Sequence, residues 1–224
     1  LNFWKETGDL SLAGHDGAQR PLGLETVALD IAITNNETVL STQLKGRNIG
    51  NAALRFSTTL AKTDAGYALH AEAPLSVNGT AQLHTLAWLP LPTSLMDATL
   101  DGKLDLLVNG QGSLRAPNLS GTVIAKNLQF MLPSEGVVLT DGLLEAQFEK
   151  DQLTIQKASW QGGDGFVETS GLLRLDKGKP VINLAWNAKD FTVISRADRL
   201  LVLSGKGNTD LTDNILSISG NFTV

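Results

Sequence analysis

The chain of 224 residues contains no cysteine, so neither a disulfide framework nor a thiolate metal site is available to it. Lysine and arginine never form a run, and the formal net charge is −5, which argues against a nucleic-acid partner. No apolar stretch approaches the roughly 20 residues that a membrane-spanning helix needs. Charged residues make up 18% of the chain against about 25% in typical proteins, so much of the surface must be small, neutral polar or apolar.

Motifs for catalysis and for metal binding are missing too. The three histidines, His15, His70 and His84, have no second histidine or carboxylate at ligand spacing. No Gly-x-Ser-x-Gly nucleophile turn and no Walker loop occurs. Paired carboxylates stay open as an alternative, because their pairing is spatial, but the acids fall mostly at turns and on polar strand faces. We expect no enzyme, no metal site and no cofactor.

What the sequence has is alternation of apolar and polar residues with a period of two, which predicts half-buried strands. The runs start near residues 27, 54, 67, 144, 182 and 216, and turn residues such as Asn35-Asn36 and Lys150-Asp151 separate them. Residues 67–77 alternate without a break and are read as one strand. About a dozen strands of about seven residues, joined by tight turns, predict an all-β, mostly antiparallel sheet.

A small polar residue followed by glycine opens strand after strand, at Asp101, Ser120, Asp141, Ser170 and Ser219 among others. The spacing varies from 15 to 34 residues, so the pattern is not a solenoid repeat of one period. Glycine inside a strand lets the sheet bend, and a regular set is expected to curl the whole sheet into a trough.

Residues 83–89 differ from the rest, because Leu83, Leu86 and Ala87 follow a helical spacing until Pro90 and Pro92 stop it. We predict one short helix there. Its apolar side would plug one end of the sheet, or it would serve as a gate or hinge in a groove.

The glycines at 162, 163 and 165 could belong to a ligand-binding loop. A dinucleotide loop needs a helix after it, yet "FVETSGLLRL" after Gly165 reads as a strand. A calcium β-roll needs an aspartate where Val167 stands, and tandem copies are missing. We read this stretch as a wide turn that binds nothing. Phe166 and Leu172 do not fit the alternation of the strand that follows.

Several motifs between residues 80 and 224 occur in an order that resembles the C-terminal part of the TamB family, the inner-membrane subunit of the translocation and assembly module. They are Trp88, Gly110 with Gly112, the step Ala116 to Gly121, Leu132-Pro133, Asp141-Gly142, and the glycines from 162 to 171. Residues 1–80 agree only in strand pattern. We expect residues 1–224 to be one elongated unit cut from a longer protein.

The resemblance implies a long, curved β-sheet folded like a taco, with an apolar interior and a polar exterior. It also implies a periplasmic location, with the full-length protein anchored in the inner membrane of a didermal bacterium. The implied role is a groove that shields acyl chains and moves phospholipids to the outer membrane. The alternative is assembly of outer-membrane β-barrel proteins and autotransporters. The implied partners are phospholipid acyl chains, a BamA-like outer-membrane barrel subunit and nascent outer-membrane β-strands.

Apolar residues at alternating strand positions are the candidates for lining the groove. They are Val27, Leu29, Ile31, Ile33, Leu54, Phe56, Leu69, Leu75, Val123, Leu128, Phe130, Leu132, Leu144, Phe148, Leu153, Ile155, Val167, Leu173, Leu175, Ile182, Leu184, Trp186, Leu216, Ile218 and Phe222.

Three other interpretations compete with the groove. An ordinary β-sandwich would bury the same residues between two sheets. A chaperone would receive unfolded strands at an unprotected edge such as "SISGNFTV". A carbohydrate enzyme would need aromatic platforms, for which four tryptophans and one tyrosine are a poor supply.

Overall fold

The computed structural model describes residues 1–5, 7–13, 19–63, 66–89, 91–92, 95, 97–176 and 178–224. His15, Pro90 and the turn residues Asp64, Ala65 and Lys177 lie outside the described residues. The strands are β1 (Asn2–Trp4), β2 (Ser11–Ala13), β3 (Gln19–Pro21), β4 (Leu24–Thr34), β5 (Glu37–Gly46), β6 (Gly50–Thr63), β7 (Gly66–Leu69), β8 (Pro74–Leu83), β9 (Thr99–Ser113), β10 (Pro117–Leu132), β11 (Val137–Glu149), β12 (Gln152–Gly162), β13 (Gly165–Asp176), β14 (Lys179–Ser195), β15 (Leu200–Thr212) and β16 (Ile215–Thr223).

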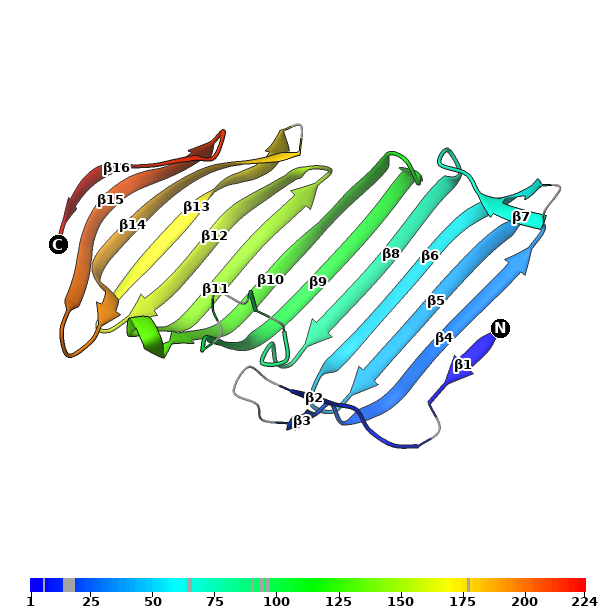
Figure 1. The fold of residues 1–224 in the computed structure, drawn as a ribbon, viewed down its shortest axis with the longest axis horizontal. Coiled ribbons are helices and arrows are strands. Elements are labelled where there is room, and N and C mark those ends of the chain that lie inside the picture. The colour runs from blue at the N-terminus through cyan, green and yellow to red at the C-terminus, as the bar shows by residue number, and fades with distance from the viewer. Residues whose placement is uncertain are drawn as a thin grey trace.

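These strands confirm the predicted all-β class. All but β2 and β3 belong to one 14-stranded sheet, whose order follows the chain from β4 to β16, with β1 beside β4 and β7 attached to β6. Every pairing between described strands is antiparallel. The sheet is open, and the two ends of the chain lie at opposite ends of an elongated molecule (Figure 1).

Tight turns make this meander possible. Asn35 and Asn36 both have positive φ, 48° and 71°, as do Asp213 and Asn214, 51° and 64°. Two consecutive residues with positive φ form the hairpin turn whose twist matches that of the strands, and asparagine tolerates this conformation. The turn predicted at Asn35-Asn36 is therefore confirmed.

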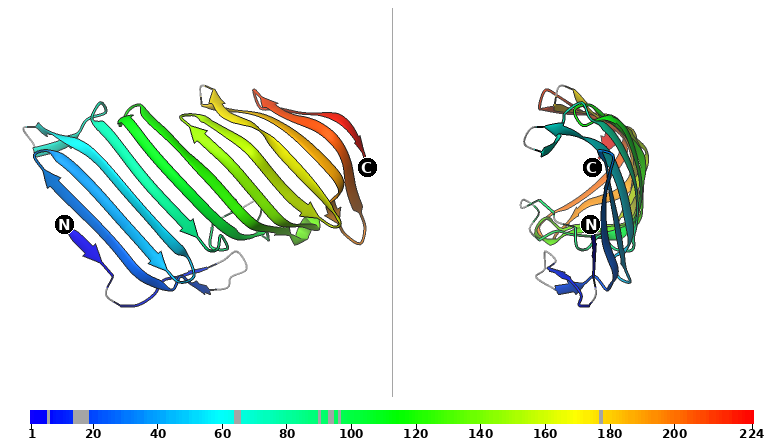
Figure 2. Two further views of the ribbon diagram at one scale, coloured as in Figure 1. Left: turned by 180° about the vertical axis from the view of Figure 1, so that it is seen from behind. Right: turned by 90° about the vertical axis from the view of Figure 1, so that its right-hand side faces the viewer.

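The strands bend along their length, so that the sheet has a C-shaped cross-section when viewed down the long axis of the molecule (Figure 2). Register shifts interrupt the pairing of β10 between Lys126 and Gln129, of β12 between Ile155 and Ala158, and of β14 between Ala188 and Phe191. Such bulges bend a strand and increase its twist. The glycines predicted to open strands, at 102, 121, 142, 171 and 220, instead lie within them.

Beyond its bulge, the last part of β14 crosses toward the start of β11. The backbone N–H of Ser195 donates to the carbonyl of Gly136 at 2.9 Å. Gly136 ends η2 (Pro133–Glu135), a single 3-10 turn between β10 and β11. Ser134 of this turn donates from its N–H and its hydroxyl to the Asp97 carboxylate, at 2.7 and 3.1 Å, and its carbonyl accepts from Arg196. These bonds join three distant segments at one rim of the curved sheet.

The helix predicted at residues 83–89 is wrong. Leu83 ends β8, and η2 is the only helix among the residues whose placement the structure gives, apart from Leu95 in a 3-10 conformation. Side chains satisfy the backbone here: Asp101 accepts from the N–H of Leu86, and the Thr85 hydroxyl from that of Ala87. These bonds replace the carbonyl partners that a helix would supply.

The single strand predicted over residues 67–77 is also wrong. Strand β7 ends at Leu69, a turn follows, and β8 begins at Pro74. Proline lacks an N–H and is tolerated at the first position of a strand, so the break at Pro74 is compatible with its chemistry.

Candidate functional site

The register of the sheet gathers the apolar residues on one face. Directly paired residues of antiparallel neighbours point to the same side. One row of such partners runs across the molecule as Leu29, Thr42, Leu54, Gly79, Val108, Gly121, Phe148, Leu153, Leu173, Ile182, Leu211 and Leu216. A parallel row runs from Val27 through Leu44, Ala52, Ala81, Leu106, Val123, Ala146, Ile155, Gly171, Leu184 and Thr209 to Ile218. We call the side that holds both rows the apolar face.

All of the candidate lining residues from the sequence lie on this apolar face. Ile31 and Phe56 belong to a third row of paired residues, and Leu144 and Trp186 belong to a fourth. Leu69 of β7 pairs with Leu60 near the end of β6. The sequence list therefore describes one continuous surface. It missed β9, whose Leu104, Leu106 and Val108 alternate inward just as clearly.

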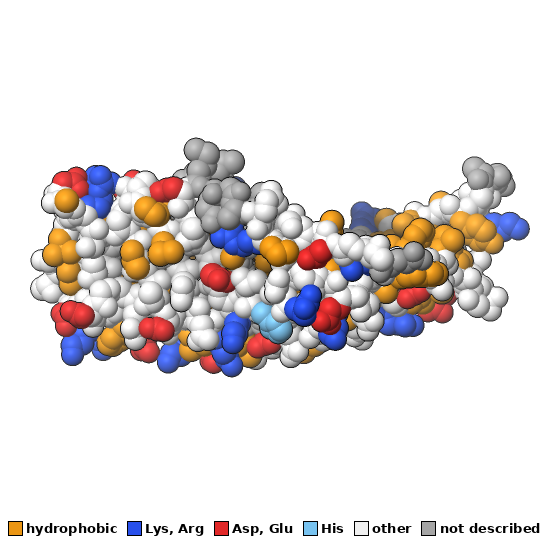
Figure 3. Space-filling model, turned by 90° about the horizontal axis from the view of Figure 1, so that it is seen from below, with side chains coloured by type: hydrophobic (Ala, Val, Ile, Leu, Met, Phe, Trp, Pro, Cys, Tyr) orange, Lys and Arg blue, Asp and Glu red, His pale blue; other side chains and the backbone are white. Residues whose placement is uncertain are grey.

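The opposite face is polar. Its central row is Asp30, Ser41, Arg55, Asn78, Asn109, Ser120, Glu149, Gln152 and Arg174. Charged side chains line the lower margin in Figure 3, while hydrophobic side chains gather on the upper side toward the N-terminal end. Phe166 and Leu172, which did not fit the alternation, lie on this polar face, paired with Gln161 and Thr154.

The apolar face is not buried under a second sheet. Of the candidate residues only Leu75 and Leu128 are buried, most of the others are half-buried, and Leu54 is 40% and Ile218 60% exposed. A sandwich would bury these side chains between two layers. The sandwich interpretation is therefore wrong for the described residues. One face of a single curved sheet (Figure 2) carries the apolar surface.

Aromatic rings on this face lie against glycines of the neighbouring strand. A Cβ atom at Gly121 would lie 2.5 Å from the ring of Phe148, and one at Gly142 would lie 2.6 Å from the ring of Trp160. Trp186 covers Gly207 in the same way. Each ring thus occupies the space that a side chain at the glycine would fill. The rings therefore lie close to the backbone of the sheet and contribute to its apolar face.

The glycine turn has a structural explanation. Gly162 and Gly165 pair across a two-residue hairpin that joins β12 to β13. A Cβ at Gly165 would lie 2.0 Å from the carbonyl oxygen of Asp190, and one at Gly162 would lie 2.5 Å from that of Thr192. Both glycines are needed because the backbone of β14 packs directly on them where it crosses toward β11.

One part of the apolar face has a polar defect. Thr38 of β5 and Thr58 of β6 pair directly, and the hydroxyl oxygen of each is buried without a hydrogen-bond partner. Thr58 is only 4% exposed. Such groups cost stability, because they lose water without gaining a protein partner.

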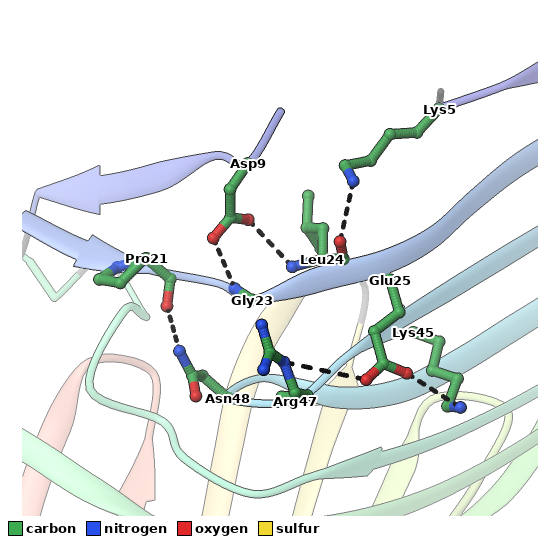
Figure 4. Close-up of polar contacts among 9 residues, drawn as sticks. All are labelled: Lys5, Asp9, Pro21, Gly23, Leu24, Glu25, Lys45, Arg47 and Asn48. Atoms are coloured by element: carbon green, nitrogen blue, oxygen red, sulfur yellow. Dashed lines mark hydrogen bonds and ion pairs between the residues drawn. The ribbon is translucent and has the colours of Figure 1, made fainter. Parts of the chain in front are cut away.

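Hydrogen bonds at the N-terminal corner hold the first segment against β4 (Figure 4). The Asp9 carboxylate accepts from the N–H groups of Leu24 and Gly23, both at 2.9 Å, and Lys5 donates to the carbonyl of Leu24. The bond from Leu24, with that from Gly23, holds the pKa of Asp9 below its usual value. The segment encloses a hollow of about 580 Å³, lined by Phe3, Trp4, Leu10, Val27, Leu29 and others.

Near this corner, Glu25 of β4 forms exposed ion pairs with Lys45 of β5 and with Arg47, just after β5. Glu25 lies 3.0 Å from Lys45, whose hydrogen bond holds the pKa of Glu25 below its usual value, and Arg47 lies 3.9 Å away. Asn48 donates to the carbonyl of Pro21 at 2.8 Å (Figure 4). The polar groups at this corner thus bond to one another and to the backbone, and they serve to hold the structure together.

The polar face carries two adjoining hollows of about 770 and 580 Å³ over β4 to β10. Neutral side chains dominate their lining, such as Gln43, Asn51, Thr80 and Thr122 in the larger one.

The part of the chain that the structure describes holds no cluster of metal-ligating side chains, because no three histidine, aspartate or glutamate side chains gather there as a metal site requires. His70 and His84 are exposed. None of the described helices is long and apolar enough to cross a membrane.

Comparison with protein-family models finds no match, and searches of the curated proteins and of the solved structures find no significant match either. The resemblance to the TamB family therefore stays a prediction.

Proposed function

We propose that this chain is a segment of a hydrophobic groove that shields acyl chains and lets phospholipids move between two membranes. The observation that supports it most is the continuous apolar face, which runs from β4 to β16 with no second sheet over it; only the N-terminal segment and the segment around Leu86 lie on it. A continuous, partly exposed apolar surface of this extent is rare in proteins that act alone in water.

Physical chemistry makes such a groove sufficient without catalysis. Burying a methylene group stabilises by about 0.8 kcal/mol, so an acyl chain of roughly 16 carbons faces a cost on the order of 12 kcal/mol in water. Neighbouring strands lie about 4.8 Å apart, so the rows across the sheet offer an acyl chain a path tens of ångströms long. The polar headgroup stays in water at the open side. No cofactor or metal enters this proposal.

Location and partners follow from the resemblance to the TamB family and are part of the same proposal. The chain would lie in the periplasm of a didermal bacterium, with its full-length protein anchored in the inner membrane. A BamA-like barrel subunit in the outer membrane would receive the far end.

Photocrosslinking tests the proposal with neighbouring residues that point to opposite faces. Phe148 lies on the apolar face, whereas Gln147 of the same strand pairs with Thr122 and Thr154 on the polar face. Benzoylphenylalanine at position 148, illuminated with vesicles of phosphatidylethanolamine and phosphatidylglycerol, should yield lipid adducts detectable by mass spectrometry. Position 147 should yield few or none. Equal yields at the two positions, or no adduct at 148, would count against the groove.

The alternative function, assembly of outer-membrane β-strands by strand addition, is tested at β16, which pairs only with β15 among the described strands. Under this alternative, proline at Ser217 and Ser219 should abolish binding of an unfolded barrel protein, while Phe148→Glu in the groove should have no effect.

A further inference from the structure

One segment outside the sheet lies on the apolar face. Leu86, in the connection between β8 and β9, is 6% exposed and packs against the buried Ala125 and Leu128 of β10. Half-buried neighbours complete its surroundings; they are Leu83, Leu100, Leu104, Leu144 and Trp160. These residues come from five adjacent strands of the proposed groove. We call this place the Leu86 site.

The segment Thr85–Leu89 is not part of the sheet, and polar contacts hold it in place. One oxygen of the Asp101 carboxylate accepts from the Thr85 hydroxyl at 2.6 Å, from the N–H of Leu86 at 3.1 Å and from that of Gly102 at 2.7 Å. Partial burial raises the pKa of Asp101, but the Thr85 hydroxyl and the backbone N–H groups outweigh it and leave the pKa below its usual value. The charged carboxylate is therefore the form that holds the segment.

A second contact holds the far end of the segment. Trp88 packs against the separate cluster of Leu22, Leu24 and Ile49 at the N-terminal corner, and its indole N–H donates to the carbonyl of Thr85. These contacts involve the backbone N–H of Leu86 and the side chains of Thr85 and Trp88, but not the Leu86 side chain. Displacing that side chain therefore need not break any of them.

We propose that the Leu86 site is an acyl-chain site that the protein's own leucine fills when no lipid is bound. The inference rests on the proposed function, because the site lies within the same apolar rows. Leucine is a short branched alkyl group, and an acyl chain with several methylene groups buries more apolar area on the same surface. The lipid would displace Leu86, so the segment Thr85–Leu89 competes with lipid at this point of the groove.

The test follows Trp160, which lines the site, by ¹⁹F NMR of the whole chain labelled with 5-fluorotryptophan. Single Trp→Phe variants assign the signals. The probe is stearic acid with a nitroxide near its methyl end, which broadens the signal of any tryptophan it approaches. The variant Leu86→Ala should broaden Trp160 at a probe concentration about tenfold lower than wild type, because removing an internal competitor raises apparent affinity. Leu107→Ala, a leucine of β9 on the polar face, is the matched control and should leave the midpoint unchanged.

A second variant keeps the test decisive if Leu86→Ala does not fold. Asp101→Ala removes the bonds to Thr85 and Leu86 but leaves the leucine in the chain, and it should shift the Trp160 midpoint in the same direction. If the probe concentration that half-broadens Trp160 is unchanged or higher in both variants, while Trp186 is still broadened, Leu86 is a permanent part of the core. That result would overturn this inference but leave the proposed groove standing. If neither Trp160 nor Trp186 broadens in any form of the protein, the proposed groove itself is overturned.

Discussion

At the scale of single residues, the apolar face combines close packing with one uncompensated polar pair. Aromatic rings fill the volume above glycines, while Thr38 and Thr58 keep hydroxyls that bond to nothing in the protein. A different threonine, Thr209, shows the ordinary case, because its hydroxyl accepts from the indole N–H of Trp186 at 3.3 Å. A threonine hydroxyl thus lowers the stability of the fold at Thr58, where it has no partner, and contributes to it at Thr209, where it accepts a hydrogen bond.

The variant Thr58→Val should stabilise the protein by about 1 kcal/mol, because it removes a buried hydroxyl without a partner and valine favours strands. Urea unfolding followed by circular dichroism measures the change. Thr209→Val is the control and should lower the free energy of unfolding, because it leaves the indole N–H of Trp186 without its acceptor. A loss of stability for Thr58→Val would mean that the hydroxyl has a partner in solution, such as water.

Residue identity predicted the two faces well, because alternation with a period of two needs no knowledge of neighbours. It gave no account of Phe166 and Leu172, which lie on the polar face beside Gln161 and Thr154. It also could not identify the partners of the Leu86 side chain, because they belong to strands as far along the chain as Trp160. Contacts at such separation have no local signature.

At the scale of elements, bulges and glycines decide how each strand bends and what it can approach. A matched pair of glycines on the apolar face shows the difference. At Gly142 an added Cβ would lie 2.6 Å from both Leu128 Cβ and the Trp160 ring. At Gly79 the nearest atom is a terminal methyl of Leu54, 3.1 Å away, on a side chain that can turn.

Gly142→Ala should therefore lower the free energy of unfolding by about 1–3 kcal/mol, the usual cost of overpacking, and should shift the fluorescence of Trp160. Gly79→Ala should be neutral or slightly stabilising, because it mainly reduces the freedom of the unfolded chain. Thermal and urea unfolding of both variants provide the comparison. A similar cost at both sites would show that backbone freedom, and not the ring, explains the glycine at 142.

Element boundaries were harder to predict than element type. The helical spacing of Leu83, Leu86 and Ala87 is real, but Asp101 lies 15 residues from Leu86 and holds the segment in a non-helical form. The strands are also longer than the predicted seven residues, up to 17 in β14. Asp141, which was predicted to open a strand with Gly142, lies inside β11 at a bulge and has positive φ. A sequence reading cannot tell a bulge from a turn without the partner strand.

At the scale of the whole molecule, each strand from β4 to β16 is bonded mainly to the strands before and after it in the chain. Strands further apart meet where β14 reaches β11 and β12, and the segment around Leu86 packs across several strands. The sequence predicted an open, curved sheet, but the crossing of β14 depends on the bulge at Asp190 and on Gly162 and Gly165 together. Such a concerted feature is visible only in three dimensions.

Removing β16 by ending the chain at Thr212 should leave the rest of the sheet folded. Strand β16 pairs only with β15 among the described strands, and every one of its residues is exposed. Amide hydrogen exchange should rise in β15, next to the new edge, and stay unchanged in β4, β5 and β6. Loss of protection throughout the sheet would mean that the fold is one cooperative unit, contrary to its nearest-neighbour pairing.

The order of the strands has a consequence for how such a protein changes its size over evolution. Because the strands follow the chain one after another, duplicating one hairpin would add two strands and lengthen the molecule by about 10 Å. The new pair would need only two compatible neighbours, with no rearrangement of a shared core. The length of the molecule and the curvature of its sheet can thus change separately. The number of hairpins sets the length, while bulges and glycines within each strand set the curvature.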